Sequence, residues 1–246
     1  MFVLLQTSYF TIAENADSTK QVSHFSGSVL VTNKGISLIP SLTLGKPAAQ
    51  FEFSMGKGKL TFEPQFRFAL EGKPWSFIFW WRYKFTDTER FRFNIGAHPA
   101  LSFKTVDLSA SGGSADGMIV RRYLAAELAP TFVLSKKVSV GPYYLIARGV
   151  EEEIAHNTHY LTLRGNVSNM RLSEQLTMEI SPQVYYLRIH KTVGYYWASG
   201  FSLAKTNLPV SFSALINKKI DSDIAGDDFI WNVSLIYSFG KKYKQL

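Results

Sequence analysis

The residues best suited to hydrolytic chemistry are a histidine and a serine separated by one residue. His24 and Ser26 form the pattern His-x-Ser, and in a β-strand this spacing places both side chains on one face. A serine nucleophile also needs a group that orients its histidine base, and Asn33 is the candidate for that amide. Because a three-residue pattern arises readily by chance, the sequence assigns no catalytic residue here.

The other histidines form neither a catalytic nor a metal-binding group. His98 and Ser102 share a strand face but lie about 13 Å apart at the rise of a strand, too far for proton transfer. His156 and His159 point to opposite faces of any strand and make no metal site without partners. The chain has no cysteine, which excludes thiolate metal sites, and no glycine-rich phosphate loop opens a helix. No metal or cofactor is therefore expected.

A group of basic residues offers a different chemistry, the binding of anions. Arg82 and Lys84 precede a short turn at 86–89, and Arg90 and Arg92 follow it. With a period of two, all four share one face of two adjoining strands. The same face of neighbouring segments carries the basic residues Arg67, His98, Lys104 and Arg121, and the acids Glu52, Glu63, Glu71, Glu127 and Glu179. The face is therefore either an anion-selecting basic wall or a set of Arg–Glu pairs that stabilises the fold.

The elements that carry these residues are amphipathic strands. The stretch PWSFIFWWRYKF at 74–85 places an aromatic face, made of Trp75, Phe77, Phe79, Trp81, Tyr83 and Phe85, opposite polar and basic groups. The alternation recurs in GISLIPSLTL, AAQFEFSM, KLTFEPQFRFAL and RFRFNIGAHPALSF. It ends with FIWNVSLIYSF, in which Trp231 and Phe239 lie on the apolar face. No comparable stretch has a 3.6-residue period, so the chain is all-β.

Two all-β architectures fit this alternation, a soluble sandwich and a membrane barrel. The apolar faces continue over five or six alternate positions, and aromatic residues lie toward both ends, as in the two girdles of a membrane barrel. The opposite faces carry Ser, Thr, Asn, Gln, Gly and isolated charges rather than the Lys and Glu of a soluble surface. Only 19% of the residues are charged, whereas 15% are aromatic. These features favour a transmembrane antiparallel β-barrel.

The pattern resembles the outer-membrane β-barrel proteins of Gram-negative bacteria over about residues 35–240. The terminal strand WNVSLIYSF resembles the family's aromatic-ended assembly signal, with Phe239 as its closing residue, although GKKYKQL follows it. The resemblance implies location in the bacterial outer membrane, contact with its lipid, and recognition of the terminal strand by the barrel-assembly machinery. The His-x-Ser pair resembles that of outer-membrane phospholipases, so hydrolysis of phospholipid or lipid A is the competing hypothesis.

Connections of alternating length predict an up-and-down barrel of twelve strands. Long connections at 106–117, 151–157 and 218–228 alternate with short ones at 135–137, 168–171 and 205–208. Because the short turns of such barrels face the periplasm, both termini are expected there. The first strand is expected near Gly35. Residues 1–34 are then a signal remnant and a periplasmic or lumen-inserted stretch, 35–240 the barrel, and 241–246 a basic tail. A further alternating stretch, FSGSVLVTNKG, leaves open a count of fourteen.

The expected function is non-enzymatic. The barrel is either a small porin-like channel with a basic lumen or a component of an envelope assembly. A net charge of +8 suits an anionic solute or an anionic lipid as partner. No nucleic-acid-binding module or basic helix is recognisable, so a nucleic acid is not expected.

Overall fold

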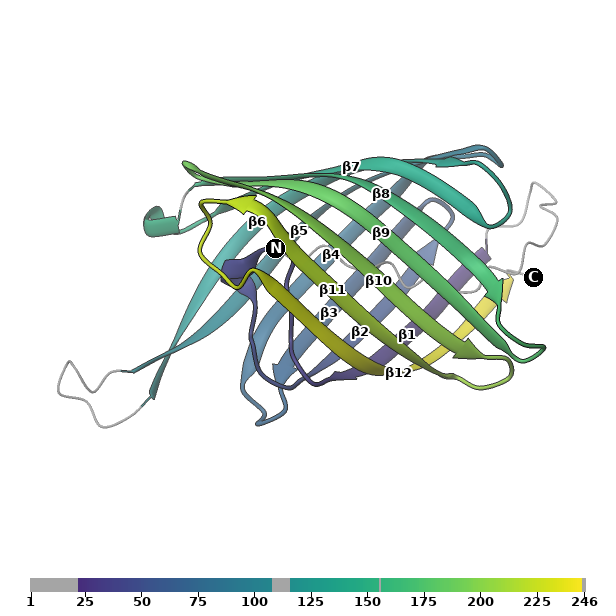
Figure 1. Ribbon diagram of the computed structural model, residues 1–246, viewed down its shortest axis with the longest axis horizontal. Coiled ribbons are helices and arrows are strands. Elements are labelled where there is room, and N and C mark those ends of the chain that lie inside the picture. The colour runs from purple at the N-terminus through teal and green to yellow at the C-terminus, as the bar shows by residue number, and fades with distance from the viewer. Residues whose placement is uncertain (1–21, 108–115, 155, 245–246) are drawn as a thin grey trace.

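The chain closes into a β-barrel of twelve antiparallel strands (Figure 1). The computed structural model describes residues 22–107, 116–154 and 156–244. The strands are β1 (Val22–Thr32), β2 (Ala48–Lys57), β3 (Leu60–Ala69), β4 (Pro74–Asp87), β5 (Phe91–Asp107), β6 (Asp116–Val133), β7 (Val138–Gly149), β8 (Asn157–Arg171), β9 (Leu176–Ile189), β10 (Thr192–Lys205), β11 (Val210–Ser222) and β12 (Phe229–Lys244). Each pairs with its neighbours in sequence, and β1 pairs with β12. The predicted all-β, twelve-stranded up-and-down barrel is confirmed. Within the described ranges, no helix is long and apolar enough to cross a bilayer.

The two ends of the barrel differ in the length of their connections. At the end called here the turn end, connections span 58–59, 88–90, 134–137, 172–175 and 206–209, and β1 begins and β12 finishes there. At the loop end, connections span 33–47, 70–73, 108–115, 150–156, 190–191 and 223–228. The expected alternation is present, with the β3–β4 and β9–β10 connections the shortest at the loop end.

Apolar side chains cover the outer wall. On β12 the alternate residues Phe229, Trp231, Val233, Leu235, Tyr237 and Phe239 are exposed, whereas Ile230, Asn232, Ser234 and Ile236 between them are buried. Exposed apolar residues recur on other strands, among them Trp81, Tyr83 and Phe85 on β4, Leu124 and Leu128 on β6, and Leu161 and Leu163 on β8. A monomer in water does not present so continuous an apolar surface. The outer wall is therefore matched to acyl chains.

The first strand differs from the prediction. Strand β1 pairs with both β12 and β2 and completes the barrel, whereas the strand expected at 36–44 does not form. That stretch is a loop containing the short 3₁₀ helix η1 (Pro40–Leu42). Pro40 has no N–H to offer a strand ladder, but the first turn of a helix does not need one. The barrel thus begins at Val22 rather than near Gly35 and extends to Lys244 rather than 240. Residues 1–21, where the signal remnant was expected, lie outside the described residues.

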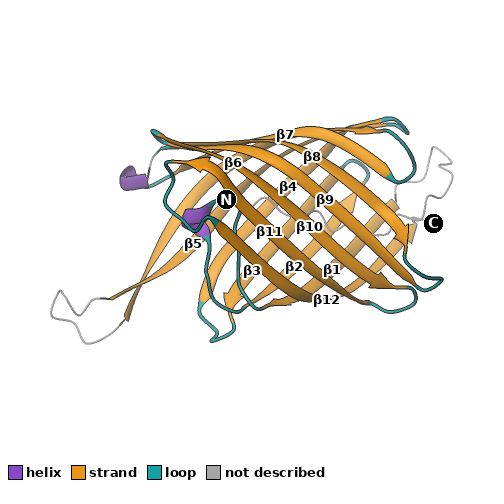
Figure 2. Ribbon diagram, viewed as in Figure 1, coloured by secondary structure: helices purple, strands orange, loops and turns teal. Residues whose placement is uncertain are grey.

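The interior of the barrel is apolar toward the loop end. Buried side chains of β2 and of β4 to β12 form one cluster together with Ile36, Leu38 and Ile39 of the β1–β2 connection. Figure 2 shows η1, in the same connection, at the loop end of the barrel. A barrel of eight strands is narrow enough for wall side chains to fill. With twelve strands the lumen is wider, and a chain segment folds inward to complete the core.

Candidate functional site

Residues 35–44, called here the inserted segment, occupy the lumen at the loop end. Two backbone hydrogen bonds close the base of the inserted segment. The Gly35 N–H donates to the Lys46 carbonyl at 2.7 Å, and the Leu44 N–H donates to the Gly35 carbonyl at 3.0 Å. Within the segment, the Ser37 N–H donates to Thr43 Oγ1, and that hydroxyl donates back to the Ser37 carbonyl, both at 3.1 Å. These bonds satisfy backbone groups that would otherwise be costly to place among apolar side chains.

Two aromatic residues of the wall anchor the inserted segment. Trp75 Nε1 donates to the Leu42 carbonyl at 3.0 Å, and the Tyr185 hydroxyl donates to the Leu38 carbonyl at 3.1 Å. Both rings are almost fully buried. The segment is therefore fixed to opposite parts of the wall, β4 on one side and β9 on the other.

The burial of Trp75 corrects a prediction. Trp75 was expected to face lipid with the other aromatic residues of its stretch. The pairing of β3 with β4 shifts by one residue between Arg67 and Phe68, and this irregularity places both Trp75 and Ser76 inside. The remaining members of the stretch follow simple alternation. Trp81, Tyr83 and Phe85 are exposed, and Phe77 and Phe79 are partly exposed.

A ladder of four tyrosines, which the sequence pattern did not predict, lines the wall from β7 to β10. Tyr143, Tyr160, Tyr185 and Tyr196 follow one another with ring centroids 6.1, 4.9 and 4.8 Å apart. Their hydroxyl groups find partners, as in the bonds from Tyr160 to Gln183 (3.0 Å) and between Tyr196 and Ser222 (2.7 Å). The available signal was that each tyrosine lies on the inward face of its strand. Alternation alone did not show that the four lie at one level.

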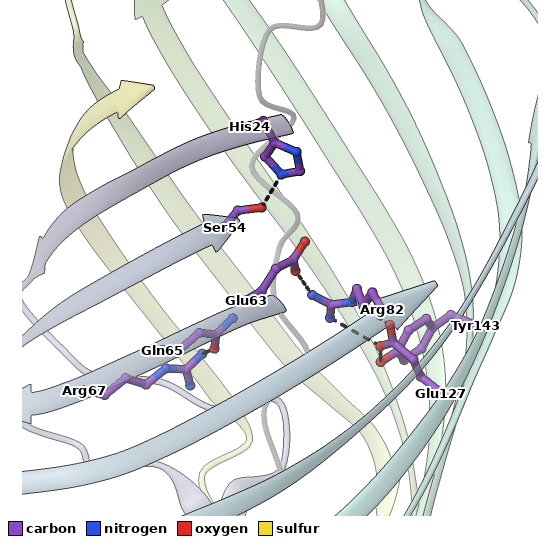
Figure 3. Close-up of polar contacts among 8 residues, drawn as sticks. All are labelled: His24, Ser54, Glu63, Gln65, Arg67, Arg82, Glu127 and Tyr143. Atoms are coloured by element: carbon purple, nitrogen blue, oxygen red, sulfur yellow. Dashed lines mark hydrogen bonds and ion pairs between the residues drawn. The ribbon is translucent and has the colours of Figure 1, made fainter. Parts of the chain in front are cut away.

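Arg82 is the centre of a buried ionic network (Figure 3). Its Nε lies 2.6 Å from Glu127 Oε1, and its Nη1 pairs with Glu63. The Tyr143 hydroxyl donates to Glu127 Oε2 at 2.6 Å, and the guanidinium lies 4.1 Å from the ring centroid of Trp80. Only 12% of the Arg82 side chain and 3% of the Glu127 side chain are exposed. At Arg82, this supports the hypothesis of stabilising Arg–Glu pairs over that of a free cation.

The other basic residues of the predicted wall fall into two groups. Arg67 and His98 are buried in the lumen. Arg67 Nη2 donates to Gln65 at 3.0 Å, and the His98 ring lies 4.1 Å from that of Trp80. Lys84 and Arg92 lie at the turn end, where each pairs with Asp87 and remains more than half exposed. Arg90 is exposed in the adjoining turn, so charges at this end are largely solvated.

The remaining two basic residues lie at the loop end. Pairing of β5 with β4 ends at Ser102, and pairing of β6 with β7 ends at Tyr123. Beyond these residues the β5–β6 hairpin extends past the barrel wall (Figure 1). Arg121, opposite Ser102, lies at the rim, and Lys104 lies on the extending hairpin. The expectation that Lys104 lines the lumen is therefore wrong, because the strands that would enclose it have ended.

The histidine considered for catalysis has a different serine partner. His24 Nε2 lies 3.1 Å from Ser54 Oγ on the neighbouring strand (Figure 3). The pattern suggested Ser26 as the partner, but Ser54 is placed by the pairing of β1 with β2. No group of three or more potential metal ligands occurs in the part of the chain that the structure describes.

Comparisons with known proteins find similarity in structure but not in sequence. No family model and no curated protein matches the chain. The KdgM porin in complex with disordered oligogalacturonate matches with a TM-score of 0.52 at 10% identity, covering 88% of this chain and 99% of that chain. A second structure of the KdgM porin gives 0.50 at 12% identity, covering 87% and 99%. The chain has the fold of an outer-membrane porin barrel. The resemblance inferred from the strand pattern is thus confirmed for the fold.

The porin fold does not bring residue roles with it at these identities. LpxR from Salmonella typhimurium also matches, with a TM-score of 0.48 at 12% identity, covering 87% of this chain and 99% of that chain. A likeness at that level carries no argument about activity. The function of this porin-fold barrel must therefore be inferred from the side chains of its own lumen.

Proposed function

We propose that the protein is a non-enzymatic outer-membrane channel in which the inserted segment controls passage at the loop end. One observation carries the proposal. The bonds from Trp75 and Tyr185 hold residues 38–42 across the lumen, among apolar side chains. Water and solute cannot cross a packed apolar layer, so the lumen conducts only when this segment moves.

The turn-end half of the lumen has a different character and suits solute entry. Inward positions there include Ser26, Ser54, Asn166, Ser181 and Ser202. Polar side chains of this kind support a water-filled passage. The apolar layer near the loop end then acts as the barrier, and the polar half as its vestibule.

The proposed orientation places the loop end outside the cell and both chain ends in the periplasm. Barrels of this class have short periplasmic turns and longer outer loops, and β1 begins and β12 finishes at the turn end. In this orientation the inserted segment closes the channel from the outside.

The proposed solute is a small anion. Arg67 and Arg164 face the lumen on opposite walls, and each lies beside an aromatic ring, with the guanidinium carbon 5.5 Å from the Trp75 ring centroid and 4.6 Å from the Tyr143 ring centroid, respectively. Guanidinium groups give the lumen positive charge, and their geometry suits carboxylate and phosphate as ligands. The similar KdgM porin was solved with oligogalacturonate, an anionic saccharide. Neutralisation of Arg82 by two carboxylates makes the expected anion preference modest.

Planar-bilayer recording tests the proposal. Replacing residues 36–43 by Ser-Gly keeps Gly35 and Leu44, whose hydrogen bond already closes the base of the loop. The shortened protein is expected to conduct several-fold more than the wild type and to prefer anions, with a preference that weakens as salt screens the charges. Trp75→Ala is expected to act in the same direction, and Trp81→Ala, outward on the same strand, serves as its control. Equal conductance of wild-type and shortened protein would show that the segment is no barrier.

A lipid hydrolase is the second candidate, favoured by the His24–Ser54 hydrogen bond. A serine activated by histidine could attack an ester. This candidate is tested by incubating the purified protein with labelled phospholipid and with lipid A. The channel proposal expects no product. Turnover that His24→Ala or Ser54→Ala abolishes, with Ser26→Ala as comparison, would replace the channel with an enzyme.

A further inference from the structure

A basic patch lies on the outward face of the barrel at the loop end, away from the lumen. It consists of Arg148 on β7, Asn157 and His159 on β8, Arg188 on β9 and His190 in the β9–β10 turn, and is called here the rim patch. The pairing brings Arg148 opposite Asn157 and His159 opposite Arg188. Four of these residues, Asn157, His159, Arg188 and His190, line a pocket of about 240 Å³.

The hydrogen bonds of the rim patch orient its side chains and leave donors free. The Tyr144 hydroxyl bonds to His159 Nδ1 at 2.8 Å, which leaves Nε2 directed elsewhere. Arg188 Nε donates to the His190 carbonyl at 3.2 Å, which fixes the guanidinium without using its terminal nitrogens. Arg148 Nη1 lies 3.4 Å from Asn157 Oδ1, which is long for a hydrogen bond, so this contact is weak. The patch is therefore arranged to donate to an acceptor from outside the chain.

No carboxylate neutralises the rim patch among the described residues. Acids are close in sequence, in the 150–156 connection. Glu151 is paired with Arg122 at 2.7 Å, and the Arg122 side chain holds the pKa of this carboxyl below its usual range. Glu152 and Glu153, in the 3₁₀ helix η3 (Glu152–Ile154), are exposed, and no ion pair joins either to Arg148 or Arg188 in the described part of the chain. Within that part, the two arginines have no counter-charge.

The position of the rim patch relative to the membrane identifies the class of ligand. Directly toward the turn end on the same outward face lie Tyr144, Leu161, Tyr186 and Tyr195. Tyrosines of this kind mark the level where acyl chains give way to headgroups. The rim patch lies one step beyond that level, where a lipid carries its phosphate. Arginine is the side chain best suited to hold a phosphate by two parallel hydrogen bonds.

We propose that the rim patch binds the phosphate of an anionic lipid headgroup in the leaflet at the loop end. Arg148 and Arg188 supply the charge, and His159 and Asn157 add hydrogen bonds. A lipid rather than a solute is the ligand because the patch faces outward, beside the apolar wall, and not into the lumen. The inference rests on the membrane-exposed wall and is independent of whether the lumen conducts.

Binding measurements on the intact barrel in neutral detergent micelles test this proposal. The probes are diphosphorylated lipid A, the same lipid with its phosphates removed, and inorganic phosphate. The wild type is expected to bind the phosphorylated lipid at least about tenfold more tightly than the dephosphorylated one, because charged hydrogen bonds are lost without the phosphate. Arg148→Gln with Arg188→Gln is expected to remove that difference.

A matched variant distinguishes a lipid site from a general attraction between a basic barrel and anions. Arg122→Gln changes another outward arginine at the same end, one that Glu151 already neutralises, and is expected to leave lipid binding unchanged. Retention of the folded mobility of the barrel on unheated gels shows that each variant is folded. Equal binding of both lipids, or unchanged binding by the double variant, would overturn the proposal. Inorganic phosphate binding as tightly as the phosphorylated lipid would overturn the assignment to a lipid.

Discussion

At the scale of residues, a network of ion pairs around Arg82 stabilises the lumen of the barrel. Arg82 has two carboxylate partners and an aromatic face, and it is nearly buried. The alternation of polar and apolar residues predicts that Arg82, Glu63 and Glu127 lie on inward faces, and it predicts nothing further about them. It does not show that they meet, because that depends on the register of β3 to β6. Two hypotheses for the basic wall thus stayed open until the pairing was known.

Substitution of Arg82 is expected to destabilise the barrel strongly. Arg82→Gln removes the cation that is paired with the buried Glu127 and the partly buried Glu63, and removal of one partner of a buried pair costs about 3–5 kcal/mol. Adding Glu127→Gln is expected to restore part of that loss. Lys84→Gln, whose pair with Asp87 is half exposed, is expected to cost less than about 1 kcal/mol. Equilibrium unfolding by guanidinium in lipid bilayers measures all three. A cost for Arg82→Gln no larger than that for Lys84→Gln would mean that the network contributes nothing.

At the scale of elements, the seam between β1 and β12 closes the barrel. Gly27 lies opposite Phe239 and opposite Phe53. A Cβ built on Gly27 would lie 2.7 Å from the Phe239 ring and 2.9 Å from the Glu52 carbonyl oxygen. The ring could move, but the backbone oxygen could not. The aromatic ring of the terminal strand therefore covers a glycine of the first strand, and the small residue is required at this place.

Enlarging Gly27 is expected to weaken the seam. Gly27→Val forces β1 away from β2 and from the Phe239 ring, and overpacking of this kind costs about 1–3 kcal/mol. The expected readout is a lower temperature for loss of the compact form on unheated gels. Val29→Ala, on the same outward face of β1, is the comparison and removes volume without a clash. A thermal transition for Gly27→Val equal to that of the wild type would show that the strands tolerate the added side chain.

Prolines show how far element prediction could go. Pro40, Pro64, Pro99 and Pro130 lie in stretches with the alternation of a strand, and a proline offers no N–H to a strand ladder. At Pro40 the strand is absent and η1 forms instead. The pairing of β2 with β3, of β4 with β5 and of β6 with β7 is interrupted beside Pro64, Pro99 and Pro130, and then resumes in the same register. Sequence alone locates the missing N–H but does not say whether the chain continues as a strand or leaves the sheet.

At the scale of the whole molecule, the alternation of apolar and polar residues was sufficient to predict the barrel architecture. It was not sufficient to predict which segment fills the lumen. Because the outer wall contacts lipid on every strand, the same alternation of apolar and polar residues recurs along the chain and can be recognised in the sequence. The inserted segment also alternates, in GISLIPSLTL, because it too must bury one set of side chains. Side chains buried inside a barrel and side chains in contact with lipid give the same alternating pattern in the sequence. For this reason the inserted segment was predicted to be a wall strand, whereas β1 was not.

The outer wall itself makes a stability prediction. Phe79→Arg places a charge near the middle of the lipid-facing side of β4 and is expected to cost about 2–4 kcal/mol, whereas Phe85→Arg, near the turn end of the same strand, is expected to cost about 0–1 kcal/mol. Unfolding in bilayers measures both free energies. Equal costs at the two positions would contradict a depth-dependent lipid contact, and recovery of the wild type without detergent would contradict membrane location.

The central claim is that the inserted segment closes the lumen at the loop end, and cysteine accessibility in cells tests it most directly. The chain has no cysteine, so Ser202→Cys, inward on the turn-end half of β10, and Ser41→Cys, exposed on the inserted segment, each give a single reactive site. A membrane-impermeant maleimide added to intact cells is expected to label Ser41→Cys and to leave Ser202→Cys unlabelled. Ser202→Cys should become reactive when residues 36–43 are replaced by Ser-Gly. Labelling of Ser202→Cys at the rate of Ser41→Cys, with the inserted segment intact, would contradict the account.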